Sequence, residues 1–338
     1  MKLLIVTQKV NINDPILGFF HRWIIEFSKH CEKITVICLE KGEFYLPVNV
    51  KVLSLGKENG VSKIKYLVNF YKYIWRERKN YDAVFVHMNQ EYILLAGFWW
   101  RLIGKKVFMW RNHNAGSWLT DLAAFFCTKV FCTSKYSYTA KYKKTVLMPV
   151  GVDTEIFKPD PNVNKIPHSI LFLARMSPAK KPHILIEALK FLKEKKVEFV
   201  ANFYGDPALS DQSYYENLKQ KVVDYGLDDR IIFHKGIPNR DTVAIYNQHK
   251  IFVNLSSSGM YDKTIFEAMA CGCVVLTSNE NLSGEIDGKY LFEQDNINNL
   301  IEKLSQALFD QDLIPVFYKI IERHNLKKLA ENLFAILN

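Results

Sequence analysis

The sequence predicts an α/β protein built from two doubly wound, Rossmann-like domains. Short β-branched and apolar runs alternate with longer stretches of helical period along the whole chain, a pattern typical of parallel sheets covered by helices. The length of 338 residues exceeds that of one ordinary domain. A proline-rich segment, KPDPNVNKIPH (158–168), separates two similar halves and is typical of a linker. We therefore expect domains at 1–155 and 166–324.

Strands are predicted in both halves, because each half contains short apolar runs bounded by turn residues. In the first half they are LLIVT (3–7), ITVICL (34–39), VKVLSL (50–55), AVFVH (83–87), KVFMW (106–110), KVFCT (129–133) and TVLMP (145–149). In the second half they are SILFLA (169–174), FVANFYG (199–205), IIFHKG (231–236), IFVNLS (251–256) and VVLTSN (274–279). Since ligands collect at the carboxyl ends of parallel strands, polar residues just after these runs are the candidate site residues.

The positive charge is concentrated in the first half of the chain. The net charge is +10; residues 1–150 hold 23 Lys and Arg against 10 Asp and Glu, or +13, and the remainder holds 22 against 25, or −3. A basic half suggests an anionic partner, which could be nucleic acid, a membrane surface or a phosphorylated substrate. The longest apolar run, YILLAGFWW, is too short to cross a bilayer, and KLLIVT after Met1 is too short for a signal peptide. A soluble, cytoplasmic protein is expected.

The six cysteines include no CxxC pair, which predicts reduced, buried thiols rather than a disulfide framework. Cys271 and Cys273 flank a turn glycine, where a metal role is disfavoured. We expect neither a metal ion nor a cofactor.

The segment ARMSPAKK (174–181) is a candidate diphosphate site. Arg175 ends a predicted strand, and Lys180 opens the next helix after Ser177 and Pro178, which are favourable N-cap and N1 residues. Two cations beside a helix N-terminus suit a diphosphate, because the exposed N–H groups and the dipole favour the same negative charge. The alternative is that both are solvated surface cations.

The segment SSSGMYDKTIFEAMACG (256–272) follows a predicted strand and leads into an apolar helix. Gly259 could bring backbone amides close to a phosphate, and the helix from about Thr264 would direct its N-terminus there. The Glu267 carboxylate could then accept hydrogen bonds from a ribose diol. The alternative for Glu267 is simple complementation of the helix dipole.

Five segments in order resemble the landmarks of family 4 retaining glycosyltransferases of the GT-B fold: GVDTEIFKP, LARMSPAKKP, FYGDP, DDRIIFHKGIP and FEAMACGCVVLTS. The resemblance covers nearly the whole chain. It implies two domains facing each other across a cleft, a last helix (about 325–338) that packs back on the first domain, and transfer of a sugar from a UDP- or GDP-sugar to a hydroxyl acceptor. It also implies roles for individual residues: Arg175 and Lys180 hold the donor diphosphate, Glu267 binds the ribose, Gly18 approaches the diphosphate from the other domain, and His113 contacts the donor sugar.

Other residues that follow strands are predicted to line the same sites. On the donor side these are Gly205, Gly236, Ile237, Gly259, Met260, Tyr261, Asp262, Lys263 and Thr264, and on the acceptor side His87 and Asn89. A histidine at a strand end is also commonly a satisfied structural residue, which remains the alternative for His87. The family usually carries a further glutamate at the position of Gly259, so we expect Asp262 or Lys263 to lie near the sugar or phosphate instead.

The segment KIKYLVNFYKYIWRERK (63–79) predicts an amphipathic helix. At 100° per residue, one stripe is predicted to pack on the first sheet: Ile64, Leu67, Val68, Tyr71, Ile74 and Trp75. The opposite side is predicted to face outward with rings beside cations: Tyr66, Phe70 and Tyr73 with Lys65, Lys72 and Arg76. Such a face suits an anionic membrane surface, so we expect peripheral binding at the inner face of the cytoplasmic membrane and a lipid-linked or cell-envelope acceptor. The alternative is that these rings cover a neighbouring loop.

Two other functions stay open at this point. A sugar-nucleotide epimerase of the same fold would require additional acid and base carboxylates beside the donor site. A basic nucleic-acid-binding α/β protein would carry its cations on one face without a diphosphate site. The glycosyltransferase interpretation is favoured, and no nucleic-acid partner is expected.

Overall fold

The computed structural model describes residues 1–256, 260–310 and 317–338, which divide into two compact units. The first unit contains Met1–Gly151, Pro238–Arg240 and Asn325–Asn338, and the second contains Val152–Ile237 and Asp241–His324. Each of the twelve predicted strands is present within these residues, with ends that differ from prediction by a few residues at most. No helix among them is long and apolar enough to cross a membrane.

A seven-stranded sheet forms the first unit, with order β3-β2-β1-β4-β5-β6-β7 and all neighbouring strands parallel. Its strands are β1 (Lys2–Val10), β2 (Lys33–Lys41), β3 (Val50–Ser54), β4 (Ala83–His87), β5 (Lys106–Trp110), β6 (Lys129–Cys132) and β7 (Thr145–Leu147). Its α-helices are α1 (Phe19–Ser28), α2 (Lys63–Arg76), α3 (Glu91–Leu102), α4 (Trp118–Phe126) and α11 (Leu326–Leu337), with short 3-10 turns η1 (Lys57–Asn59) and η2 (Tyr138–Lys141).

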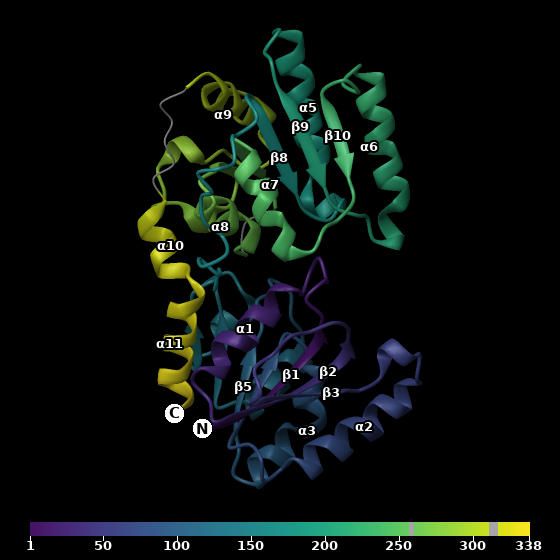
Figure 1. Ribbon diagram of the computed structural model, residues 1–338, viewed down its shortest axis with the longest axis vertical. Helices are drawn as coiled ribbons and strands as arrows, with labels where there is room; N and C mark the ends of the chain where they lie inside the picture. The colour runs from purple at the N-terminus through teal and green to yellow at the C-terminus, as the bar shows by residue number, and fades with distance from the viewer. Residues whose placement is uncertain (257–259, 311–316) are drawn as a thin grey trace. The chain divides into compact units, whose positions relative to one another are not determined.

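The helices of the first unit cover both faces of its sheet. The successive apolar side chains of β1 point to opposite faces, so both faces must be covered. Leu3 and Ile5 belong to a core covered by α1 and α11, and Leu4 and Val6 belong to a core covered by α2, α3 and α4. Figure 1 shows α11 beside α1 and the pair α2 and α3 on the other side of the sheet. The last helix of the chain is therefore part of the first unit's core.

Helix α2 buries the face that the sequence analysis predicted to be exposed. Of the predicted inner stripe only Ile74 is buried, whereas Ile64 is 75% exposed. Phe70, predicted to point outward, is 1% exposed, and Tyr66 and Tyr73 pack partly buried against the same core. Both sides of this helix are apolar, and the aromatic side matches the core, where the Phe70 ring contacts other rings of that core. The predicted orientation of α2 was wrong.

A five-stranded parallel sheet forms the second unit, with order β10-β9-β8-β11-β12. Its strands are β8 (Ser169–Leu173), β9 (Val200–Tyr204), β10 (Ile231–His234), β11 (Ile251–Asn254) and β12 (Val274–Thr277). Its α-helices are α5 (Pro182–Glu194), α6 (Gln212–Asp224), α7 (Thr242–Gln248), α8 (Lys263–Ala270), α9 (Ile297–Phe309) and α10 (Tyr318–His324). Its short 3-10 turns are η3 (Pro178–Lys180), η4 (Leu209–Asp211), η6 (Glu280–Leu282) and η7 (Gly288–Tyr290). A further turn, η5 (Asn239–Asp241), has its first two residues in the first unit and Asp241 in the second.

The proline-rich segment 158–168 is not a free linker between the two units. The division falls at Gly151 and Val152, ahead of the predicted boundary at 155, and the proline-rich segment lies wholly in the second unit. There Asp160 N donates to the side-chain oxygen of Asn247 (2.8 Å), so the segment is held against α7. Prolines fix an extended backbone, and this backbone finds its hydrogen-bond partners on the surface of the second unit.

Candidate functional site

The order of strands in the second sheet brings two predicted site segments together. Strands β8 and β11 are neighbours, and the chain runs outward from them in opposite directions, toward β10 on one side and β12 on the other. In doubly wound sheets such a switch point leaves room beyond the carboxyl ends of the strands, where ligands bind. Lys180 follows β8, and the segment from Ser256 to Asp262 follows β11. This place is the candidate functional site.

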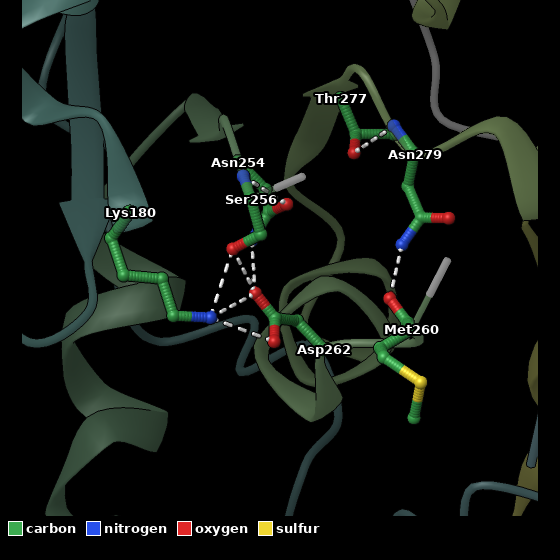
Figure 2. A network of polar contacts seen from close by, with 7 residues as sticks. All are labelled: Lys180, Asn254, Ser256, Met260, Asp262, Thr277 and Asn279. Carbon is green, nitrogen blue, oxygen red and sulfur yellow. Dashed lines mark hydrogen bonds and ion pairs between the residues drawn. The ribbon is translucent and has the colours of Figure 1, made fainter. Parts of the chain in front are cut away.

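Lys180 is held there by a network of polar side chains (Figure 2). Its Nζ lies 2.9 and 2.7 Å from the two carboxylate oxygens of Asp262 and 2.9 Å from Ser256 Oγ. Asn254 Nδ2 donates to Asp262 Oδ2 at 3.0 Å, and the Ser256 hydroxyl donates to the same oxygen. An ammonium group has three donors, and these contacts fix its position at the end of the sheet.

The ion pair between Lys180 and Asp262 is partly desolvated. Burial opposes ionisation of Asp262, but the charge of Lys180 and the hydrogen bonds from Ser256 and Asn254 hold the pKa of this carboxyl below its ordinary value. Each of the two charged side chains is 24% exposed. The lysine side chain is therefore both positioned and partly exposed, as an anion-binding cation must be.

The loop before α8 is anchored by a buried asparagine after β12. Asn279 Nδ2 donates to the backbone oxygen of Met260 at 2.6 Å, and Asn279 N donates to Thr277 Oγ1 at 3.2 Å (Figure 2). Tyr261 is tied down at its far end, because its hydroxyl donates to the backbone oxygen of Asn281 at 3.2 Å. Met260 and Tyr261, the two residues before Asp262, are thus both hydrogen-bonded to the segment that follows β12.

Glu267 lies within α8, which begins at Lys263, next to the predicted start at Thr264. Its side chain is only 2% exposed, and the Tyr246 hydroxyl donates to it at 3.3 Å. Burial lowers the pKa of the neighbouring Lys263, while the charges of Glu267 and Asp153 act in the opposite direction. Glu267 is therefore a buried carboxylate with a cation and a phenol as neighbours. Burial of a charged group costs free energy unless it has such polar partners, whereas a carboxylate that only complements a helix dipole at the surface does not need them.

The segment after β8 differs from prediction in detail. Lys180 lies in the 3-10 turn η3, and α5 begins at Pro182, so Lys180 precedes the helix instead of opening it. Ser177 and Pro178 begin η3 rather than α5. Arg175 lies two residues after the end of β8 and is exposed. The structure therefore brings Lys180, but not the Arg175 side chain, into the network around Asp262.

Gly205 and Gly236 follow the two strands beyond β8. A Cβ on Gly205 would lie 1.9 Å from the backbone oxygen of Ala174, and its φ of +146° favours glycine. Gly236 N donates to Asp206 Oδ2 at 3.0 Å. These glycines shape the carboxyl edge of the sheet; Ile237 follows there, partly exposed.

Gly18, His87 and Asn89 end or follow β1 and β4, the two strands at the switch point of the first sheet. His87 is 2% exposed, its ring stacks on Phe20 at a centroid distance of 3.9 Å, and its Nδ1 lies 3.2 Å from Thr7 Oγ1. A Cβ on Gly18 would lie 2.5 Å from the Asp14 backbone oxygen, so the local turn itself requires glycine there. These environments favour the structural alternative for His87.

Asn89 and His113 are more accessible. Asn89 is partly buried just after β4. His113 is exposed in the loop after β5, and its Nδ1 accepts a hydrogen bond from Ala115 N at 2.9 Å. Its ring is thereby oriented by its own loop.

Several polar residues of the site were not singled out from the sequence. They are Asn254, Ser256, Asn279 and Tyr246, which contact the predicted residues directly. Asn254 interrupts the apolar strand IFVNLS, and Asn279 ends VVLTSN. A polar side chain in a buried strand is a usable signal, because it needs a partner. Gly259, which stands where the related family carries a glutamate, lies outside the described residues.

The described residues include no cluster of histidine, cysteine and carboxylate side chains arranged to hold a metal ion. All six cysteines are buried, and burial raises the pKa of the Cys271 and Cys273 thiols. Their predicted burial is confirmed.

Comparison with known proteins identifies relatives of both halves. The sequence profile described as "Glycosyl transferases group 1" matches residues 153–332. A galactosyltransferase of Escherichia coli, named as acting from UDP-Gal on alpha-D-GlcNAc-diphosphoundecaprenol, is 27% identical over 336 residues, which cover 83% of this chain and 81% of that protein. The YtcC glycosyltransferase of Bacillus subtilis (strain 168) is 29% identical over 175 residues, and the match spans 49% of this chain but only 41% of that protein.

Solved structures show the same fold. The Anabaena protein HepE, crystallised with UDP and glucose, superposes with a TM-score of 0.79 over 100% of this chain and 99% of that one, at 17% sequence identity. The predicted GT-B fold class, with two parallel α/β sheets, is confirmed.

Proposed function

Because the chain belongs to the group 1 glycosyl transferase family, we propose that it transfers a sugar from a nucleotide-diphosphate sugar to a hydroxyl acceptor, with retention of configuration at the anomeric carbon. The observation that carries the proposal is the position of Lys180, a partly exposed cation held at the switch point of the second sheet. The UDP found with HepE supports a nucleotide donor of this kind.

The chemistry follows from charge that develops as the donor breaks. When the bond from the anomeric carbon to the diphosphate lengthens, negative charge grows on the diphosphate oxygens. A fixed ammonium group at Lys180 stabilises this charge more strongly in the transition state than in the bound donor. Arg175, exposed just before it, supplies a second cation to the same diphosphate. The acceptor hydroxyl attacks on the face of the leaving group, and a diphosphate oxygen takes its proton.

Asp262 has a positioning role in this scheme. It contacts both the lysine and the two hydrogen-bonding residues Asn254 and Ser256, so it fixes the ammonium before the donor arrives. Preorganised charges cost no reorganisation during the reaction. Glu267, buried one turn inside α8, is the residue we assign to the donor ribose. Neither step requires a metal ion.

Nucleotide binding provides the direct test. UDP, GDP and ADP are added separately to the full chain, and its melting temperature is measured. A nucleotide at about 100 times its Kd should stabilise the protein by about 2.7 kcal/mol, a shift of several degrees. Lys180→Ala should reduce the shift, and Lys195→Ala, which removes an exposed lysine of the same unit, should not. Absence of a shift with every nucleoside diphosphate would contradict the proposal.

For the acceptor we propose a lipid-linked or cell-envelope glycan, met at the inner face of the cytoplasmic membrane. The E. coli relative is named for a diphosphoundecaprenol acceptor, and the basic first half would favour an anionic surface. Transfer of radiolabelled sugar to an organic-extractable lipid fraction, compared with transfer to soluble glycans, distinguishes this acceptor from a soluble one.

A further inference from the structure

The outward side of α2 carries large apolar side chains that the first unit leaves uncovered. They are Ile64, Leu67, Val68, Tyr71 and Trp75. Their exposed fractions run from 41% for Leu67 to 75% for Ile64, although the opposite side of the same helix packs in the core. A helix of a globular protein normally has one apolar stripe, and a second one indicates a second apolar environment.

The neighbouring helices of this layer continue the apolar surface. Their exposed members are Leu95, Phe98 and Leu102 on α3 and Trp118, Leu119, Leu122 and Phe125 on α4. We call the exposed apolar side chains of α2, α3 and α4 the helical face.

Contacts between the helices show that the helical face is continuous. From α2 to α3, the Tyr71 hydroxyl donates to the Leu95 backbone oxygen at 3.0 Å, and the Trp75 and Trp99 rings lie 6.1 Å apart. From α3 to α4, the rings of Phe98 and Phe126 lie 6.5 Å apart. Figure 1 shows α2 and α3 together on one side of the first sheet. Extended apolar surfaces of this kind mark interaction sites.

Positive charge borders the helical face. Helix α2 contains Lys63, Lys65, Lys72 and Arg76, all exposed, and no acidic residue. At 100° per residue, Lys65, Lys72 and Arg76 fall on one flank of the exposed stripe. The acid that follows the helix, Glu77, is buried and paired with Lys51 and Arg76. An apolar strip flanked by cations is complementary to a bilayer with anionic headgroups.

We propose that the helical face docks on an anionic membrane surface, with its aromatic and aliphatic side chains at the boundary between headgroups and acyl chains and its cations among the phosphates. Two copies of this chain facing each other would bring the same cations together, so charge favours the membrane over self-association. This inference rests on the proposed function, because it gives a lipid-linked acceptor a surface on which the enzyme meets it.

Vesicle sedimentation of the full chain tests the proposal. Wild-type protein should bind vesicles of phosphatidylcholine containing phosphatidylglycerol, bind far more weakly to phosphatidylcholine alone, and lose binding as salt rises. Reversing Lys65, Lys72 and Arg76 to Glu should weaken binding at least about 100-fold, since each cation near the surface contributes roughly fivefold and each new acid is repelled. The same reversal at Lys195, Lys319 and Lys327, exposed lysines that are not part of α2, α3 or α4, is the matched control.

A second set of variants tests the apolar contribution. Trp75→Ser, Phe98→Ser and Phe125→Ser together should weaken binding at least tenfold. Phe309→Ser, which removes a ring of the same 67% exposure as Phe98 but on α9 of the second unit, should leave binding unchanged. Because these side chains are exposed, the variants should melt like the wild type, and a melting curve verifies this.

Three results would overturn the proposal: equal binding to neutral and anionic vesicles, equal loss in the control variants, or a wild-type dimer that the Trp75, Phe98 and Phe125 substitutions convert to a monomer. Nucleotide stabilisation is measured on the same samples. If nucleotides stabilise every variant and only vesicle binding fails, the membrane inference falls and the donor site stands. If no nucleotide stabilises even the wild type, the proposed function falls whatever the vesicles show.

Discussion

Both units contain a switch point, where the strand order of the sheet reverses, but the side chains at the two switch points differ in chemical character. In each sheet the strand order reverses beside the first strand, at β1 and β4 in the first unit and at β8 and β11 in the second. The first switch point is filled by rings, since His87 stacks on Phe20 and lies beside Trp23. The second is filled by the charged pair of Lys180 and Asp262. The comparison teaches that topology supplies a place for a ligand, and side chains decide whether that place can bind a charged one.

Deletion of residues 325–338 should break the first unit and spare the second, the largest effect we expect. The deleted helix buries five large side chains in the first unit's core: Leu326, Leu329, Leu333, Phe334 and Leu337. At roughly 1.5–3 kcal/mol each, their loss is on the order of the whole stability of a domain. Calorimetry should show the first unit's transition missing. As a control, Lys327→Ala on the exposed side of the helix should have little effect.

Lys180→Ala should abolish most transfer activity without unfolding the protein. Removal of a preorganised cation from a developing diphosphate charge should cost about 2–4 kcal/mol of transition-state stabilisation, a fall of roughly 30- to 900-fold in kcat. Asp262, left without its ion-pair partner, should also lower stability, and Asp262→Asn in the same variant should restore stability but not activity. Normal turnover in folded Lys180→Ala would rule out the assigned role.

His87→Ala should show the reverse pattern at the other switch point. The ring is buried and stacked, so its loss leaves a cavity and should lower the free energy of unfolding by roughly 2–3 kcal/mol. Because the residue is packed, kcat in the folded variant should change by only a few-fold. His113→Ala, in an exposed loop after a neighbouring strand, provides the contrast, with little effect on stability. A large loss of kcat with unchanged stability in His87→Ala would instead support the predicted acceptor-side role of this residue.

A pH dependence of stability should arise in the second unit from the partly buried His324. Burial, with a further contribution from Arg323, lowers the pKa of His324 from 6.5 to about 4. Below pH 6.5, His324 is protonated in the unfolded chain but remains neutral in the folded chain. The free energy of unfolding therefore falls between about pH 6.5 and 4 and levels off below pH 4. Because one pKa unit corresponds to about 1.4 kcal/mol, the loss should be at most about 3 kcal/mol, measured by denaturant unfolding. His324→Gln should flatten this window; an equal slope in the variant would exclude His324 as its source.

Local pattern was sufficient to predict the sheets. Every strand is a short apolar run in a chain where strands and helices alternate, and burial on both faces makes such runs continuous in parallel sheets. Lys180 was found for the same reason, since it follows a strand and therefore lies at the carboxyl edge. Its partner Asp262 was identified as a site residue, but the ion pair was not, because 82 residues separate them and only strand order makes them neighbours.

Helix α2 marks the limit of what the sequence determines. The sequence by itself specified the two parallel α/β sheets, the helix, its two apolar sides and the cations along it, since period and composition are local properties. Only the tertiary structure decided which side is buried. Phe70 enters the core beside Tyr92 and Trp100, and the side with Ile64 remains outside. The free energy of burying a side chain depends on the shape and volume of the partners it meets, and those partners come from distant parts of the chain.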